Sequence, residues 1–108
     1  MRTNPLKEAE EMAKYVTLYN FTDQGIRAVK ESPGRLAAAI QAAEGVGMKV
    51  LAAYYTLGPY DLAVVTEAQD EKAATAFTLA TGAQGNVRSM TMRAWDPDEF
   101  GEIVAMMP

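Results

Sequence analysis

The alternation of hydrophobic and polar positions predicts four β-strands, over residues 13–21, 48–57, 60–67 and 86–95. In the first and fourth strands, successive side chains belong to two alternating sets, one for each face. This pattern is typical of a strand whose two faces have different surroundings. The second and third are rich in β-branched and aromatic residues, and Gly58-Pro59 lies between them. Because glycine permits a tight reversal and proline interrupts a strand ladder, these two strands are expected to form a hairpin.

Apolar residues at helical spacing predict a helix after the first strand. Thr22-Asp23 offers an N-cap, Ser32-Pro33 offers a second one, and residues 35–43 are rich in alanine, the strongest helix former. Gly45 and Gly47 close this stretch. We therefore expect either one helix with a kink near Ser32-Pro33 or two consecutive helices.

Two more helices are predicted in the second half of the chain. Asp70 is the expected N-cap of a helix that ends at Gly82 or Gly85, and Asp96 is the expected N-cap of a C-terminal helix. The signal for the C-terminal helix is strong, because a proline follows Asp96 at the first helical position and Glu99 stands three residues after the cap.

The order of elements is β-α-β-β-α-β followed by a helix, which predicts an α+β, ferredoxin-like fold. Right-handed crossovers would arrange the four-stranded antiparallel sheet in the order 4-1-3-2, with two helices on one face. The 108 residues fit one domain. We assign residues 13–95 to this domain, residues 1–12 to a short helix or disordered arm, and residues 96–108 to a C-terminal helical extension.

The second and third predicted strands are apolar on both faces. Residues 50–55 have almost no polar face and residues 62–65 have none, whereas a sheet with one face in water should alternate. Two helices can cover only one face. We therefore expect a second copy to cover the other face about a two-fold axis, which gives a homodimeric α/β barrel or a larger homo-oligomer. The alternative is that the helix from Asp96 onward folds across this face of its own chain.

Composition excludes several classes of function. The net charge of -4 disfavours nucleic acid, whose phosphates require clustered Lys and Arg. No apolar run approaches the roughly 18 residues of a membrane span, and the N-terminal residues lack the apolar core of a secretory signal, so a cytoplasmic protein without a membrane partner is expected. The chain has no cysteine and no histidine. It therefore lacks a thiolate, the usual general base and the commonest metal ligand, and we expect no metal and no cofactor.

Tyrosines and one aspartate are candidates for ligand binding. Asp61, next to Tyr60, could accept a proton from a ligand, or it could satisfy backbone donors at the turn. Four further tyrosines could line a pocket for a flat apolar ligand, or they could pack in the core or at an interface. These are Tyr15, Tyr19, Tyr54 and Tyr55. Because successive strand side chains alternate, Tyr54 and Tyr55 cannot face the same side.

Two arginines of the predicted fourth strand form a further candidate group. Arg88 and Arg93 lie on opposite faces, where either one could hold a ligand carboxylate or simply keep a sheet edge charged. Arg35 could act in the same way, or it could belong only to the start of a helix. The ligand-binding candidates are Tyr15, Tyr19, Tyr55, Tyr60, Asp61, Arg88 and Arg93, and no residue is assigned a catalytic role.

Gly58, Tyr60 and Asp61 form a Gly-x-Tyr-Asp pattern at the predicted hairpin, and in this the chain resembles the GYD domain family. The resemblance spans about residues 15–95 and also rests on residues 15–25, 33–35, 55–57, 67–68 and 85–88. It implies a dimeric α/β barrel and self-association, and little chemistry. Proteins with the wider fold include cofactor-free monooxygenases, isomerases, small-ligand sensors and haem enzymes, of which the haem group is set aside because this chain has no histidine.

These observations leave three hypotheses of function open. The first is a homo-oligomeric binding protein that holds a small apolar or aromatic molecule between the sheet and its mate. The second is a cofactor-free enzyme, of monooxygenase or isomerase type, that acts on an activated phenol or enol through a tyrosine or Asp61. The third is a protein that only assembles and has no pocket.

Overall fold

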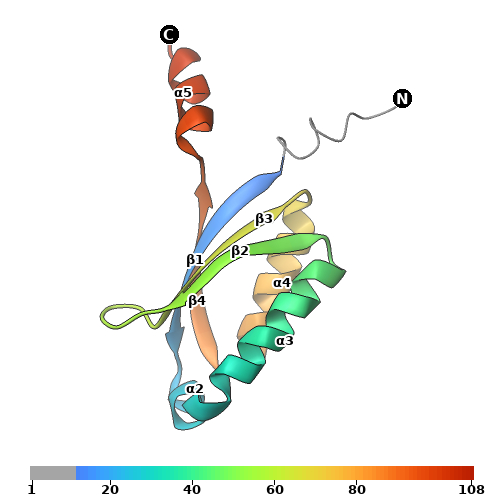
Figure 1. The fold of residues 1–108 in the computed structure, drawn as a ribbon, viewed down its shortest axis with the longest axis vertical. Helices are drawn as coiled ribbons and strands as arrows, with labels where there is room; N and C mark the ends of the chain where they lie inside the picture. Colours follow the sequence, from blue (N-terminus) through green and yellow to red (C-terminus); the bar gives the residue numbers. More distant parts are fainter. Residues whose placement is uncertain (1–11) are drawn as a thin grey trace.

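A computed structural model describes residues 12–108, and the elements in this part follow the predicted order (Figure 1). The strands are β1 (Ala13–Phe21), β2 (Met48–Tyr55), β3 (Leu62–Ala68) and β4 (Val87–Ala94). The helices are α2 (Asp23–Arg27), the 3-10 turn η1 (Val29–Glu31), α3 (Ser32–Gly45), α4 (Glu71–Ala83) and α5 (Pro97–Ala105). The predicted N-terminal helix or arm falls, up to residue 11, outside the described residues.

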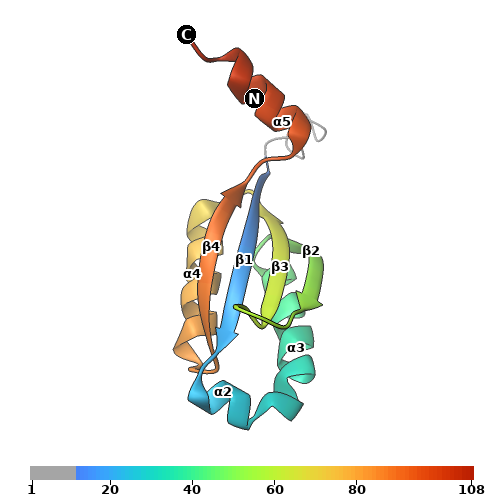
Figure 2. The ribbon, with the colours of Figure 1, turned by 90° about the vertical axis from the view of Figure 1, so that its left-hand side faces the viewer.

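The four strands form one antiparallel sheet in the order β2-β3-β1-β4. This is the predicted order 4-1-3-2 counted from the opposite edge, so the α+β, ferredoxin-like fold is confirmed. Helices α3 and α4 lie on the same face of the sheet, which leaves the other face open (Figure 2). Helix α5 continues beyond the end of β4 and points away from the sheet, so it does not cover the open face (Figure 1).

Short-range capping explains where the helices begin. The Thr22 side chain accepts a hydrogen bond from the Gly25 N–H at the start of α2, and the Asp70 side chain accepts one from the Lys72 N–H at the start of α4. At α5 the predicted capping box is present, with Asp96 and Glu99 each accepting from the other's backbone N–H. The step predicted near Ser32-Pro33 is also found, because η1 ends at Glu31 and α3 begins at Ser32.

The hairpin loop is longer than the sequence predicts at both ends. Strand β2 ends at Tyr55 and β3 begins at Leu62, so Asp61 lies in the loop and not in the strand. The backbone N–H of Asp61 donates to the Tyr19 carbonyl of β1, 2.8 Å away, and its carboxylate accepts from the Phe21 N–H, also at 2.8 Å. These bonds tie Asp61 to β1, and its carbonyl also accepts from the Thr56 N–H across the hairpin at 2.9 Å.

The two faces of the sheet carry different side chains. Thr17 of β1 and alternate residues of β3, from Leu62 to Ala68, are buried under the helices. A compact core lies at one end of this layer, where Ala43, Met48, Ala68 and Ala74 pack together with Tyr15, Val50 and Phe77. Among the described residues no large side chain is fully buried, because the helices present many alanines to the sheet.

The open face of the sheet carries an apolar band, which we define from the strand register as two rows of four side chains. One row is Ala52, Val65, Val16 and Met92, and the other is Tyr54, Ala63, Leu18 and Met90. A charged row of Lys49, Glu67 and Lys14 borders the apolar band on one side, and Asn20 and Arg88 border it on the other. The predicted second apolar face is therefore present and has polar margins.

Gly25 is required for the contact between α2 and the turn before β4. A β-carbon at Gly25 would lie 1.9 Å from the carbonyl oxygen of Asn86, which is backbone and itself accepts from the Thr22 N–H. We expect Gly25→Ala to lower the free energy of unfolding by about 1–3 kcal/mol, because the two backbone segments must move apart. The measurement is urea unfolding followed by circular dichroism.

Gly34→Ala is the matched control for this prediction. No heavy atom lies within 4 Å of a β-carbon at Gly34, which is inside α3. Alanine there should raise the free energy of unfolding by about 0.5–1 kcal/mol, because it removes the conformational freedom of glycine. Equal unfolding midpoints for the two variants would contradict the assigned contact of Gly25 with Asn86.

Candidate functional site

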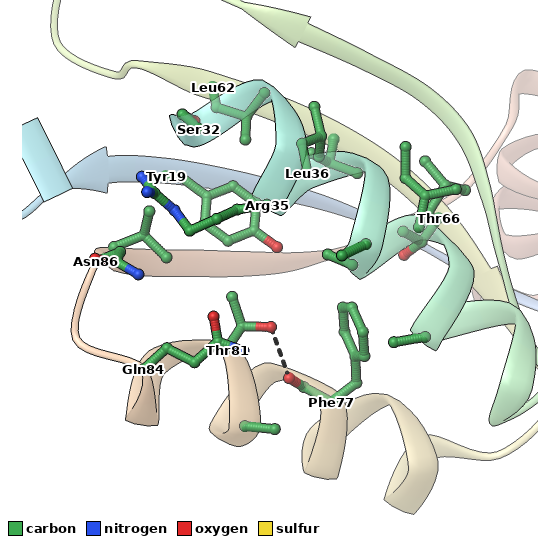
Figure 3. Close-up of a pocket in the computed structure, with 18 residues that line it drawn as sticks. Tyr19, Ser32, Arg35, Leu36, Leu62, Thr66, Phe77, Thr81, Gln84 and Asn86 are labelled. Atoms are coloured by element: carbon green, nitrogen blue, oxygen red, sulfur yellow. Dashed lines mark hydrogen bonds between the residues drawn. The ribbon is translucent and has the colours of Figure 1, made fainter. Parts of the chain in front are cut away.

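A cavity of about 360 Å³ lies between the sheet and the helices α3 and α4 (Figure 3). Its helical walls consist largely of small residues, including Ala38, Ala39 and Ala42 of α3 and Ala80 of α4. An alanine side chain cannot fill the layer between a helix and a sheet to the usual packing density, so space remains there. The cavity is thus on the covered face of the sheet, not on the open face that carries the apolar band.

The larger polar side chains of the cavity lie toward one end. Tyr19 of β1, Arg35 of α3, Gln84 and Asn86 lie at this end, whereas Phe77 of α4 lies toward the other (Figure 3). The remaining lining is mostly aliphatic and includes Leu36, Ile40, Val50, Leu62 and Val64. Arg35 is the only lining residue with a formal charge at neutral pH, and no carboxylate lines the cavity.

Arg35 has an incompletely satisfied guanidinium group. Its Nη1 donates to the Ala28 carbonyl at 3.1 Å and lies 3.6 Å from Glu31 Oε2. The Glu31 side chain is 77 % exposed, so this ion pair is largely solvated and weak. Its Nη2 is buried and has no hydrogen-bond partner among residues 12–108. Buried donors normally have partners, so this nitrogen distinguishes Arg35 from an ordinary surface arginine.

The other polar residues at this end are held by defined contacts. Burial raises the pKa of the Tyr19 hydroxyl above its ordinary value, so this group stays protonated at neutral pH. The Gln24 amide nitrogen donates to the Gln84 carbonyl and to Asn86 Oδ1, both at 3.0 Å, which ties α2 to the turn before β4. The Ser32 hydroxyl, which also lines the cavity, lies 2.9 Å from the Tyr55 hydroxyl.

Of the seven ligand-binding candidates, the structure places only Tyr19 at the cavity. Tyr15 packs against the compact core, and Tyr55 touches the cavity only indirectly through Ser32. Tyr54, which the sequence also singles out, lies on the opposite face from Tyr55 because β2 pairs it with Ala63.

The two candidate arginines of β4 lie elsewhere. The Arg93 guanidinium is 3.7 Å from the centroid of the Trp95 ring and 5.8 Å from that of Tyr15, and it donates to the carbonyls of Lys14 and Ala94. These contacts give the Arg93 guanidinium group a structural role. Arg88 is exposed and pairs with Asn20 at the margin of the apolar band, so the two arginines are on opposite faces, as the alternation requires.

Tyr60 and Asp61 contact neighbouring strands. The Tyr60 hydroxyl lies 4.0 Å from the Met90 sulfur on β4, and the Asp61 carboxylate accepts from the Phe21 N–H on β1. The Asn20 side-chain amide donates to the Pro59 carbonyl at 2.7 Å, which adds a third link between β1 and the loop. The geometry therefore gives these hairpin residues a role in fixing the loop to the sheet.

The sequence left the role of Arg35 undecided, and it did not indicate that Gln84, Asn86 and Phe77 belong to one site. The available signal was the composition of residues 35–43, in which an arginine and two large aliphatic residues stand among alanines. Small residues on the sheet-facing side of a helix leave space, and a charged residue beside that space is exceptional. Among residues 12–108, no group of three or more acidic side chains is arranged to hold a metal ion, and no helix is long and apolar enough to cross a membrane.

The fold and the cavity define a small α+β protein of ferredoxin-like architecture with a hollow between sheet and helices. The model of the GYD domain family matches residues 15–104, and the chain belongs to this family. The solved structure of MtbAldR superimposes with a TM-score of 0.56 at 15 % identity, covering 88 % of this chain, and at that identity it shows the fold alone. This chain spans 58 % of the length of that structure.

One similar protein carries a name that mentions partners. The "Glutamine synthetase and cystathionine beta-lyase binding protein" of Thermus thermophilus is 33 % identical to this chain over 84 residues. The alignment covers 77 % of this chain and 88 % of that protein.

Asp61 provides a test of the structural role of the hairpin. We expect Asp61→Ala to lower the free energy of unfolding by about 1–2 kcal/mol, because the Phe21 N–H loses a charged acceptor. Asp61→Asn keeps an oxygen acceptor and should lose less. Tyr60→Phe removes only a long contact to sulfur and should change stability by less than about 0.5 kcal/mol. Urea unfolding measures all three, and an unchanged midpoint for Asp61→Ala would show that the carboxylate is not a structural group.

Proposed function

We propose that this protein is a homo-oligomeric binding protein in which the open sheet faces of two copies pack together. The apolar band is the observation that carries this proposal. A band of eight apolar or aromatic side chains, bordered by charged and polar rows, has the composition of a protein interface with an apolar core and a polar rim. Monomers seldom leave a contiguous apolar patch of more than a few hundred Å² in water.

A second copy is the occupant that best matches this surface. The apolar band extends over all four strands, and another copy offers the same band at the same width. A two-fold axis brings such identical faces together and closes the assembly. Helix α5 of the same chain points away from the apolar band and leaves it free for this contact (Figure 1).

Leu18 lies near the middle of the apolar band and tests the proposed homodimer. We expect the unaltered 11.7 kDa chain to sediment as a dimer at micromolar concentration. Leu18→Lys should raise the dimer dissociation constant by at least about 100-fold, because each copy would bury an unpaired charge in the interface. Sedimentation equilibrium measures this constant.

Leu79→Lys is the matched control for the homodimer. Leu79 is on α4, away from the open face, and its side chain is 69 % exposed. The same substitution there should leave the dissociation constant unchanged. A compact monomer of the unaltered chain at micromolar concentration, or equal effects of the two substitutions, would refute the proposed sheet-to-sheet interface.

A second candidate function is the binding of another protein through α5. On α5, Phe100, which is 58 % exposed, Ile103 and Val104 follow the spacing with which an amphipathic helix enters an apolar groove, and Met107 continues this spacing just beyond the end of the helix. Lys14 pairs with Asp96 and Glu99 at the start of α5, at 3.5 and 3.3 Å, and so fixes the direction in which the helix projects. The name of the Thermus thermophilus relative supports glutamine synthetase and cystathionine β-lyase as the partners to try first.

The partner proposal is tested with purified enzymes from the organism that encodes this chain. We expect glutamine synthetase or cystathionine β-lyase to bind the immobilised protein in biolayer interferometry. Phe100→Ala should weaken binding by at least about tenfold, because it removes the largest exposed apolar side chain of α5. Glu102→Ala, at an exposed position of the same helix, is the control and should bind as the unaltered chain does. Undiminished binding by Phe100→Ala, or no binding of either enzyme, would remove α5 as the site.

A further inference from the structure

Arg35 is placed where a cation is difficult to accommodate without a partner. Its Nη2 is buried beside the cavity and has no hydrogen-bond acceptor in the described part of the chain. The nearest carboxylate, that of Glu31, lies 3.6 Å from the other terminal nitrogen and extends into solvent. A buried donor without an acceptor is unfavourable, and a charged one is more so. Arg35 also lines the cavity, so its guanidinium group brings an incompletely paired positive charge to the cavity wall.

The surroundings of Arg35 favour an anion over any other ligand head group. No acidic residue among those described lines the cavity, so Arg35 supplies the formal charge on its wall. Tyr19, whose hydroxyl is protonated at neutral pH, also lines the cavity, and Gln84 and Asn86 lie toward the same end as the Arg35 guanidinium group (Figure 3). These neutral groups can donate hydrogen bonds to an anion without adding a competing negative charge.

The rest of the cavity favours an apolar tail. From Leu36 toward Phe77 the lining is aliphatic or aromatic, with the Thr66 and Thr81 hydroxyls as its polar exceptions. The Thr81 hydroxyl is already used, because it donates to the Phe77 carbonyl at 2.9 Å. A volume of about 360 Å³ accommodates roughly a dozen non-hydrogen atoms, at about 30 Å³ for each water-sized group.

We propose that the cavity between the sheet and the helices α3 and α4 binds a small carboxylate with an apolar tail. The carboxylate lies against the guanidinium group of Arg35, and the tail extends over the sheet toward Phe77. Guanidinium groups recognise carboxylates through charge and N–H donors, and Arg35 is the one described lining residue that offers both. The proposed site lies on the opposite face of the sheet from the apolar band, so it does not depend on the proposed homodimer.

The test compares three probes that share a ten-carbon tail and differ in the charge of the head group. Decanoate, decanol and decylammonium are titrated below their micellar concentrations and followed by calorimetry and by amide chemical shifts. We expect decanoate to bind at least tenfold more tightly than decanol and decylammonium to bind most weakly. The largest shifts should fall on amides around the cavity, such as those of Ala39, Thr81 and Asn86. Titration with 2-naphthoate then shows whether the tail that fits is linear or flat.

Variants assign the head-group contact to Arg35. Arg35→Met should abolish the preference for decanoate over decanol and leave decanol binding in place, and Arg35→Lys should restore part of the preference. Arg27→Met is the control, because Arg27 is exposed on α2 and does not line the cavity. Ala39→Phe, which fills the cavity without changing its charge, should block all the probes.

Several results would overturn the proposal. Equal affinities of decanoate and decanol for the unaltered chain would show that the Arg35 charge does not select the head group. This comparison tests the proposal even if an Arg35 variant fails to fold. Shifts confined to the open face, at Val16, Val65 and Met92, would place the ligand on the apolar band. No binding of decanoate at millimolar concentration would show that the cavity is not a site for such molecules.

Discussion

Successive side chains of a strand point to opposite faces, and in the two central strands of this protein both sets are largely apolar or aromatic. In β1, Tyr15 and Tyr19 lie under the helices while Val16 and Leu18 lie on the open face. The helices α3 and α4 cover one face of the sheet, and the alanines they present fill that layer only in part. The sheet therefore has one apolar face that no helix in the described part of the chain covers, and a second apolar face on which the layer under the helices is only partly filled. The two surfaces to which we assign functions are these two sides.

The elements that depend on short-range chemistry could be predicted from the sequence. Thr22, Asp70 and Asp96 each accept a backbone hydrogen bond within three residues of themselves, so the helix starts are determined locally. The strand order follows from the order of elements and from the handedness of crossovers. The Asp61 carboxylate accepts from the Phe21 N–H of β1, 40 residues away in the chain, and no local pattern contains that contact.

The candidate site was less accessible to sequence reasoning, because a cavity is a lack of volume and not a set of residue types. Aromatic and charged residues drew attention, yet Arg93 stacks on Trp95 and Tyr15 packs in the core. Tyr19 reaches the cavity because its position in β1 places it under the gap between the helices. The sequence does not show that Arg35 is unusual. Only the structure shows that its Nη2 is buried without a hydrogen-bond partner among the described residues.

The opposite positions of the two surfaces have a consequence for how the protein could respond to a ligand. The sheet alone separates the cavity from the apolar band, and neighbouring residues of one strand contribute to both, such as Leu18 and Tyr19 of β1. A ligand that only fills the existing space would leave the strands in place and would not alter pairing of the open faces. A ligand could change the assembly only by binding more tightly to one sheet geometry than to another. Side chains on the two faces of the sheet are attached to the same strand backbones. A change in sheet twist would therefore move both sets and couple ligand binding in the cavity to pairing of the open faces.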